Sequence, residues 1–352
     1  MIALSDKLSY KERVRRIIKR LDVDYIPSQI DFAPILLDKL ASVWNLPKGE
    51  EGLLKVINNH IVYAYLNDVF GNIRFRTYDT KDNIKYDDWN VGWDVNADGT
   101  CLRYHPIAKI SDIDKYVFPN PAKADLMKLA KRTCDKYGKD YFVCSYQNLL
   151  LFERAWSLRG IENFMQDMLI NKDFAKYLLD KITDYQVAVA KKYVEIGVDC
   201  GRTGDDYGMQ HGMIISPNMW REFFKPRLQK IWDVYLNANL PIMHHTCGDV
   251  RLIMGDMIEM GLSILHPVQP EAMPLEEVKK QFGEKLTFYG GVSTQKTLPF
   301  GSPKEIEQEV DRCFSIMGSN GGYILGPSHT LTEEIPIENI IAFINATKKY
   351  IL

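Results

Sequence analysis

The chain has 352 residues, of which 46% are hydrophobic and 26% are charged, and its formal net charge is -2. This length suits one large α/β barrel with insertions, and the composition can fill a large core. The small net charge gives no electrostatic case for nucleic acid or an anionic membrane as a partner, and no apolar run reaches the roughly 18 residues that a membrane span needs.

The N-terminal stretch MIALSDKLSYKERVRRIIKRL is charged and amphipathic. It lacks the apolar core of a secretory signal. The six cysteines are scattered and form no CxxC pair, which is typical of reduced thiols rather than of a disulfide framework. We therefore expect a cytoplasmic protein.

The first half of the chain contains two predicted strands with an irregular segment between them. YIPSQIDF (25–32) and YFVCSYQ (141–147) are short apolar runs. Residues 60–120 break the rhythm, because aromatic and β-branched residues there flank the turn-forming residues Asn96, Asp98 and Gly99. This pattern predicts a hairpin-like insertion. Trp89 and Trp93 of the insertion either pack it or wall a substrate.

The second half alternates strand-like and helix-like segments. The predicted strands are the apolar runs at 198–204, 240–246, 262–268, 286–292 and 321–327. Ser216 and Pro217 begin a predicted helix that Pro226 should kink or split. Ser302 and Glu305 form a capping box for another helix.

Repeated strand–helix–strand steps imply parallel strands joined by right-handed crossovers. About five such steps follow residue 195, and at least two strands precede it. This count favours a (β/α)8 TIM barrel over an open sheet. We expect a single α/β barrel domain over residues 1–352, with an N-terminal extension and the insertion at 60–120.

PIMHHTCGDV, residues 241–250, contains a candidate metal site. Residues two apart on a strand point to the same side, so His245 and Cys247 can converge, whereas His244 faces the other way and is interpreted as structural. The carboxyl ends of barrel strands form the active-site face, and imidazole with thiolate is a strong pair for Zn²⁺. His329, just past the last strand, would reach the same rim. Water, a substrate oxygen or Glu271 would take the fourth position.

Each of these ligands also has a plain structural reading. The histidine and cysteine can simply pack near a strand end. His329 can be a loop histidine, and Glu271 a solvated carboxylate.

A second candidate constellation is GDDYGMQHG, residues 204–212, in which Asp205, Asp206 and Tyr207 directly follow a strand. Adjacent acids repel and desolvate one another, which can raise a carboxyl pKa toward use as a general acid. The alternative is a polar loop that caps the next helix. FERAWSLRG (152–160) likewise offers Glu153 and two arginines, either for a site or for a helix start with ordinary salt bridges.

Several segments together resemble the uroporphyrinogen decarboxylase superfamily. They are the HxCG element at 245–248, GDDYGMQ, SPNMWREFFKPR, LHPVQPEAM, LTFYGGVSTQKTLPFGSPKEIEQEV and GGYILGPSHTL. The resemblance covers most of the chain from about 140 to 350. It is greatest to the corrinoid-dependent methyltransferases, especially the methyl-transferring components of O-demethylase systems, a branch that FERAWSLRGIENFMQDML supports.

The resemblance implies a (β/α)8 barrel and a zinc held by an HxC pair plus a ligand after the last strand. The pair corresponds to His245 and Cys247. The last ligand is a cysteine in the coenzyme M methyltransferases, whereas the matching position here is His329. A uroporphyrinogen decarboxylase carries an arginine-rich RQAGR element near its N-terminus, but this chain has no arginine between Asp22 and Arg74. This absence argues against a porphyrinogen with many carboxylates.

The resulting hypothesis is methyl transfer from a small methylated donor, an aromatic methyl ether, to the cob(I)alamin of a corrinoid protein partner. Zinc on His245, Cys247 and His329 would polarise the leaving oxygen, and Asp206 or Tyr207, beside Asp205, would donate a proton. Three alternatives stay open. They are methyl transfer from methylcobalamin to a thiol or tetrahydrofolate, decarboxylation of a small acid, and a non-catalytic barrel that binds a corrinoid or a partner.

Overall fold

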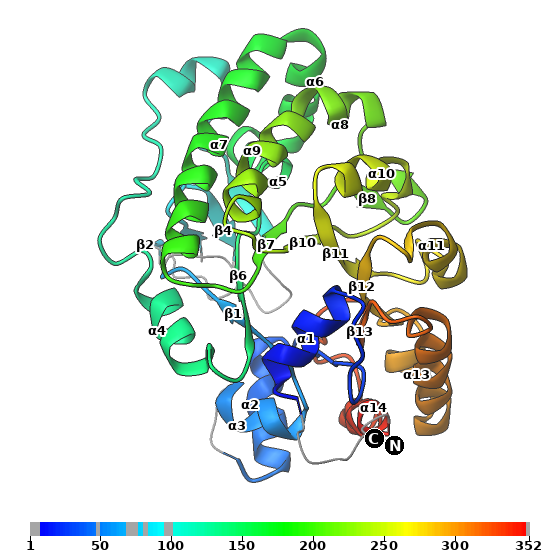
Figure 1. Cartoon of the computed structure of the whole chain (residues 1–352). Coiled ribbons are helices and arrows are strands. Elements are labelled where there is room, and N and C mark those ends of the chain that lie inside the picture. The colour runs from blue at the N-terminus through cyan, green and yellow to red at the C-terminus, as the bar shows by residue number, and fades with distance from the viewer. Residues whose placement is uncertain (1–7, 47–49, 68–76, 80–83, 95–100, 350–352) are drawn as a thin grey trace.

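The computed structural model describes residues 8–46, 50–67, 77–79, 84–94 and 101–349 (Figure 1). Its central layer is parallel, with a five-stranded sheet of order β13-β12-β11-β10-β7 and a two-stranded sheet of β1 and β6. The strands are β1 (Ile61–Ala64), β6 (Phe142–Ser145), β7 (Gly201–Gly204), β10 (Ile242–His245), β11 (Leu262–Val268), β12 (Thr287–Val292) and β13 (Tyr323–Pro327). The predicted α/β organisation with parallel strands is therefore confirmed.

Isolated parallel bridges link the two sheets on both sides. On one side, the bridge Cys144↔Cys200 connects β6 to the start of β7. On the other side, Ser28 bridges both Asn59, before β1, and Leu325 of β13. The segment 25–32, which was predicted as a strand, thus pairs with the parallel layer by isolated bridges and does not form a regular strand.

Helices cover the outer face of these strands. They are α2 (Pro34–Val43), α3 (Glu50–Val56), α4 (Lys128–Tyr137), α5 (Phe152–Arg159), α6 (Ile161–Ile170), α7 (Lys172–Glu195), α8 (Pro217–Phe223), α9 (Lys225–Leu236), α10 (Arg251–Glu259), α11 (Leu275–Phe282), α12 (Thr297–Phe300), α13 (Pro303–Met317) and α14 (Ile337–Lys348). Figure 1 shows α7 and α9 side by side, and they are in contact. None of the described helices is both long and apolar enough to cross a membrane.

The predicted helix signals hold where they can be checked. The Ser216 side chain accepts the Met219 N–H at the start of α8. The predicted helix is interrupted between α8 and α9, and Pro226 lies in the first turn of α9. Ser302 and Glu305 form the capping box of α13. A proline in the first turn is tolerated because its missing N–H would have no helical partner there.

The segment that the sequence marks as an insertion differs in part from the prediction. β1 lies at its start and is a buried parallel strand, because its four residues are apolar on both faces. A four-stranded antiparallel sheet follows, formed by β2 (Thr77–Asp79), β3 (Ile84–Tyr86), β4 (Gly92–Asp94) and β5 (Cys101–Tyr104), and then the 3-10 helix η1 (Ile110–Asp114). The predicted turn at Asn96, Asp98 and Gly99 lies outside the described residues.

Trp89 and Trp93 are both buried within this insertion. The indole N–H of Trp93 donates to Asp87, which also pairs with Arg154 at 2.8 Å. Trp89 packs against Phe118. These contacts fit the packing role that the sequence allowed for both tryptophans, and they attach the insertion to α5.

Alternate residues of the central strands belong to two different apolar clusters. Leu265, Phe288 and Leu325 pack toward the helices. Ile264, Tyr289 and Ile324, each one residue away, pack together inside the parallel layer with Met243 and Cys200. Because side chains alternate along a strand, this division also indicates which residues of β7 and β10 point inward and which point toward the helices.

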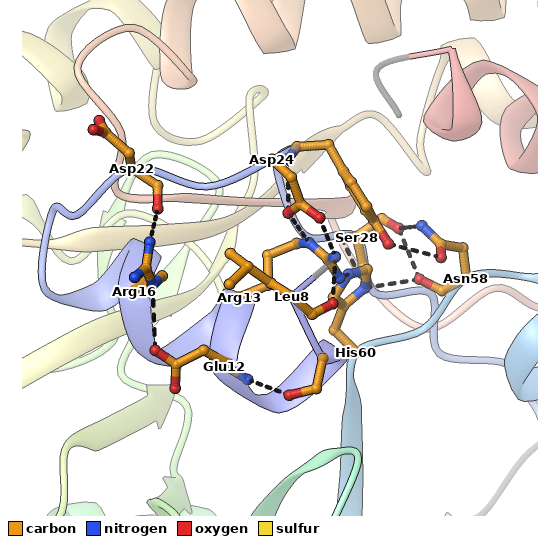
Figure 2. A network of polar contacts seen from close by, with 11 residues as sticks. Leu8, Glu12, Arg13, Arg16, Asp22, Asp24, Ser28, Asn58 and His60 are labelled. Carbon is orange, nitrogen blue, oxygen red and sulfur yellow. Dashed lines mark hydrogen bonds and ion pairs between the residues drawn. The ribbon is translucent and has the colours of Figure 1, made fainter. Parts of the chain in front are cut away.

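The helix α1 (Tyr10–Ile18) packs against the amino ends of these strands, and its Val14 and Ile17 join the inner cluster. Figure 2 shows how the buried Arg13 attaches it: Nε and Nη2 donate to the two carboxylate oxygens of Asp24, each at 2.7 Å, and Nη1 lies 3.1 Å from Nε2 of His60. Nδ1 of His60 is 2.9 Å from the Ser28 carbonyl oxygen. Helix α1 of the N-terminal extension thus covers the amino ends of the strands and is held there by the polar contacts of Arg13.

The buried histidines predict a loss of stability in acid. Burial lowers the pKa of His60 and of His244 to about 3 each. Because the unfolded chain takes up these protons near pH 6.5, stability present at neutral pH is lost as the pH falls below 6.5. Each such histidine costs about 1.4 kcal/mol per pH unit. Between pH 6.5 and 5, the free energy of unfolding measured in urea should fall by about 2 kcal/mol less in His244→Phe than in the wild type.

The exposed His211 supplies the control, because His211→Phe should keep the wild-type pH dependence. An unfolding free energy that falls equally in the wild type and in His244→Phe would contradict the prediction.

Candidate active site

Polar side chains gather at the carboxyl ends of the inner strands. β10 ends at His245, and Cys247 follows two residues later. β13 ends at Pro327, two residues before His329. Asp205 and Asp206 directly follow β7, whose Gly204 pairs in register with His245. The alternation of the strands puts His245 on the inner side with Met243, and His244 on the helix side.

The structure brings the three principal metal candidates together. One ligand atom from each of His245, Cys247 and His329 lies within 4.8 Å of the other two. Sγ of Cys247 is 3.6 Å from Nε2 of His245. His245 and Cys247 are half-buried, and His329 is exposed. The three therefore face a point that a small molecule can reach.

These donors suit zinc in kind and in spacing. A tetrahedral Zn²⁺ bound at its usual distances separates neighbouring ligand atoms by about 3.5 Å, close to the distance between Sγ of Cys247 and Nε2 of His245. Burial and nearby positive charge lower the pKa of His245 well below its usual value, so its imidazole is neutral and has a free lone pair. Burial raises the pKa of the Cys247 thiol in the absence of a cation. A bound cation reverses that effect, because it binds the thiolate.

His266 of β11, which pairs in register with His245, was not among the predicted site residues. Nδ1 of His266 lies 2.9 Å from Nδ1 of His245, on the side of the ring away from Cys247. With one proton shared between these nitrogens, Nε2 of His245 faces Cys247. Such a partner holds a ligating histidine in one tautomer and orientation. The available signal was a histidine at the same depth on the neighbouring predicted strand.

We predict that His266→Phe weakens zinc binding about 10- to 100-fold, because the ring still packs on Tyr289 but can no longer bond to His245. Competition with a chromophoric chelator measures this. His244→Phe is the matched control, since His244 lies next in the chain but bonds Thr203 at 2.9 Å on the helix side. Equal affinity in His266→Phe and the wild type would rule out the positioning role.

Asp205 lies at the start of α5, fully buried. Its carboxylate accepts the N–H groups of Leu151, Phe152 and Glu153 at 3.1, 2.7 and 2.8 Å, and the hydroxyl of Tyr207 at 2.8 Å. Burial raises its pKa to about 7, whereas these hydrogen bonds favour the ionised form. The buried Tyr207 packs on Phe152 and Phe224. Both residues thus hold the loop to α5, and their predicted part in proton transfer stays a prediction.

Asp206 faces the metal candidates instead. Its Oδ1 accepts the backbone N–H of Cys247 at 2.9 Å and lies 3.7 Å from Nε2 of His245. Burial raises the pKa of Asp206. Burial and the charges of Asp206 and Asp205 raise that of Glu153 well above its usual value. Glu153 and Asp206 are thus neighbouring carboxyls whose pKa values are both raised.

The other residues of FERAWSLRG have the structural role that the sequence allowed. Arg154 pairs with Asp87, and Arg159 pairs with Asp167 at 2.7 Å.

Glu271 accepts a hydrogen bond from Ser293, while its Oε2 is buried without a hydrogen-bond partner in the described structure. Glu271 is not among the three clustered ligands, and its role as a fourth ligand stays a prediction.

The two loops of the site touch through two glycines. A Cβ added at Gly208 would lie 2.5 Å from the carbonyl oxygen of Cys247, and one added at Gly248, whose φ is +78°, would lie 2.3 Å from the Gly208 carbonyl carbon. The Asp249 N–H donates to the Met209 carbonyl at 2.9 Å. The loop that contains Asp205 and Asp206 and the loop that contains Cys247 are therefore in direct backbone contact.

Residues 103–350 match the sequence profile of the family described as uroporphyrinogen decarboxylase (URO-D). The chain belongs to the uroporphyrinogen decarboxylase family. The superfamily that its motifs indicated is thus confirmed, and the site described above lies within the matched part of this family member.

Relatives within the family include methyltransferases and decarboxylases. The chain is 28% identical over 196 residues to a methylcobamide:CoM methyltransferase, MtaA, of Methanosarcina barkeri, covering 56% of this chain and 55% of that protein. It is 22% identical to MtbA of Methanosarcina mazei, covering 70% of each. It is 25% identical to a uroporphyrinogen decarboxylase of Christiangramia forsetii, covering 51% of this chain and 50% of that protein. The chain thus spans about half the length of several curated relatives that it matches.

A solved structure described as a methyltransferase from Methanosarcina mazei has a similar fold. The superposition has a TM-score of 0.72 at 20% sequence identity and covers 98% of this chain and 100% of that one. At this identity the likeness concerns the fold, and it extends over the N-terminal part that the family profile does not match.

Proposed function

We propose that the chain is a zinc-dependent methyltransferase that moves a methyl group from a small methylated donor, an aromatic methyl ether, to the cob(I)alamin of a corrinoid protein. The observation that carries the proposal is the cluster of His245, Cys247 and His329 at the strand ends. Nitrogen and sulfur donors in this number, with an open side, are typical of a catalytic rather than a structural zinc. The similarity to MtaA and MtbA supports the corrinoid-linked chemistry.

The proposal includes a closed (β/α)8 barrel as one domain. The bridges of Ser28 to Asn59 and Leu325, and of Cys144 to Cys200, support closure, because they join the seven named strands and residue 28 into one ring of eight. In such a barrel the carboxyl ends of the strands surround a single mouth. The mouth is where a donor and a corrinoid would meet.

Each residue of the site has a defined task in this proposal. His266 orients His245 through the contact between their Nδ1 atoms. Asp206 fixes the Cys247 backbone and is placed to hand a proton to the departing oxygen, with Glu153 as its neighbour. Asp205 and Tyr207 keep this loop against α5. Zinc, when bound, supplies Lewis-acid polarisation of the leaving oxygen, and Glu271 would complete its ligands.

A second candidate is the acceptor-side reaction, which methylates a thiol from methylcobalamin. The names of the relatives MtaA and MtbA favour it. Decarboxylation of uroporphyrinogen is less well supported, since residues 23–73 contain no arginine. A non-catalytic barrel would have no need for the acid beside the metal ligands.

The deciding experiment uses purified zinc-loaded protein with free cobalamin, followed by absorbance. Donor-side activity converts cob(I)alamin to methylcob(III)alamin with methoxybenzoates or other methyl ethers. Acceptor-side activity removes the methyl group from methylcob(III)alamin with 2-mercaptoethanesulfonate. A protein that binds zinc but carries out neither reaction contradicts the proposal.

A further inference from the structure

Five arginines of the described chain are buried: Arg13, Arg154, Arg159, Arg202 and Arg227. Four of them have a carboxylate oxygen within 2.7 to 2.8 Å. Arg202 alone has no ion pair with any described residue, although only 3% of its surface is exposed. A buried charge without a counter-ion is costly, so the exception calls for an explanation.

The surroundings of Arg202 leave one edge of its guanidinium unused. The rings of Tyr146 and Tyr63 lie 4.3 and 5.4 Å from the guanidinium carbon. One Nη donates to Asn148, whereas Nε is buried and has no hydrogen-bond partner. Oδ2 of the nearby Asp31 accepts the hydroxyls of Tyr63 and Tyr289, each at 3.1 Å, and the Asp31 charge helps to raise the pKa of Arg202 without forming an ion pair. A free edge of this kind matches a planar oxyanion, which accepts two parallel N–H bonds.

Arg202 also has a defined place relative to the metal candidates. It lies two residues before Gly204, the register partner of His245, and on the same inner side of the sheet as Cys200. Two residues of strand correspond to about 7 Å, so Arg202 lies one layer deeper than His245. Tyr146 lies at the level of Arg202 and Asn148 lies in the layer above, and both are half-buried. Seen from the strand ends, Arg202 therefore lies below the layer that carries His245.

We propose that Arg202 anchors the oxyanion head of the small acid that binds in this mouth, and so selects anionic over neutral substrates. The inference rests on the proposed function for the identity of the reacting end. The depth difference of about 7 Å favours a rigid acid with its reacting oxygen across a ring, such as 4-methoxybenzoate. A short sulfonate such as 2-mercaptoethanesulfonate shares the head-group chemistry.

Calorimetric titration of the zinc-loaded protein tests the anchor independently of turnover. The probes are 4-methoxybenzoate, 2-mercaptoethanesulfonate and the neutral methoxybenzene. The wild type should bind an acid, and Arg202→Met should weaken that binding about 10- to 100-fold, as expected for the loss of a charged hydrogen-bond pair. Arg202→Lys should restore only part of the affinity, because it keeps the charge without the fork. Whichever acid binds identifies the source of the head group.

A purely structural role would give a different result. Arg202→Met should unfold near the wild-type temperature, because it removes a buried charge that has no carboxylate partner, together with one hydrogen bond to Asn148. A lower melting temperature in both Arg202→Met and Arg202→Lys, or equal binding of methoxybenzene and the acids, would overturn the proposal. Binding that depends on Arg202 without any methyl transfer would refute the proposed function alone. Transfer from 4-methoxybenzoate that is unaffected in Arg202→Met would refute the anchor alone.

Discussion

Replacing Cys247 with alanine should reduce the zinc content from about one ion per chain to below roughly a tenth, because only two of the three clustered protein ligands would remain. The proposed methyl transfer should fall by about three orders of magnitude, since a metal ion contributes several kcal/mol to stabilising charge on a leaving oxygen. Elemental analysis after dialysis against a weak chelator measures the first effect. The cobalamin absorbance assay measures the second.

Cys101 offers the matched control. It is an exposed thiol on β5 of the insertion, so Cys101→Ala should keep both zinc and activity. His329→Ala should reproduce the Cys247→Ala result if the exposed histidine is a true third ligand. Full zinc occupancy in Cys247→Ala would remove the basis of the metal site.

Substitutions of the adjacent acids should have different effects: a change at Asp205 should reduce stability, and a change at Asp206 should reduce activity. Asp205→Ala leaves three buried N–H groups and the Tyr207 hydroxyl without their acceptor. We expect the free energy of unfolding to fall by about 3–5 kcal/mol, from the usual cost of unsatisfied buried donors. Urea denaturation at pH 7 measures this change.

Asp206→Asn should behave in the opposite way. Its amide oxygen can still accept the Cys247 N–H, so the unfolding free energy should change by less than about 1 kcal/mol. Methyl transfer should fall about 10²- to 10⁴-fold, the usual loss when a general acid is removed. If Asp206→Asn transfers methyl at the wild-type rate, proton donation must be assigned elsewhere, with Glu153 as the first residue to change.

The parallel layer and the clustering of the three candidate metal ligands were predictable for the same reason. Both depend on short-range regularities: apolar runs between glycines or prolines, and the two-residue spacing that sends His245 and Cys247 to one side. His329 followed from the rule that strand ends meet at one rim. In contrast, the pairing of His245 with His266 depends on a strand register that includes an irregularity in β10. No spacing within one segment encodes that register.

Two other differences have the same origin. β1 lies within the segment that was predicted to be an insertion. Its four apolar residues carry no flanking glycine or proline, and only its pairing with β6 identifies it. The separate tasks of Asp205 and Asp206 depend on which of them reaches the start of α5, a contact between residues more than 50 positions apart. The unpaired state of Arg202 is likewise a property of its surroundings, so the sequence could not reveal it.

The glycine contact between residues 208 and 248 has a practical implication for engineering this protein. Lengthening either segment, or giving either position a side chain, would shift the proposed proton donor Asp206 and the proposed cation site at once. Attempts to widen substrate choice should therefore leave this junction intact and diversify the rim elsewhere, for example around Tyr146 and Asn148. Grafting the cluster of His245, Cys247 and His329 onto another protein would similarly require transplanting both segments as a unit.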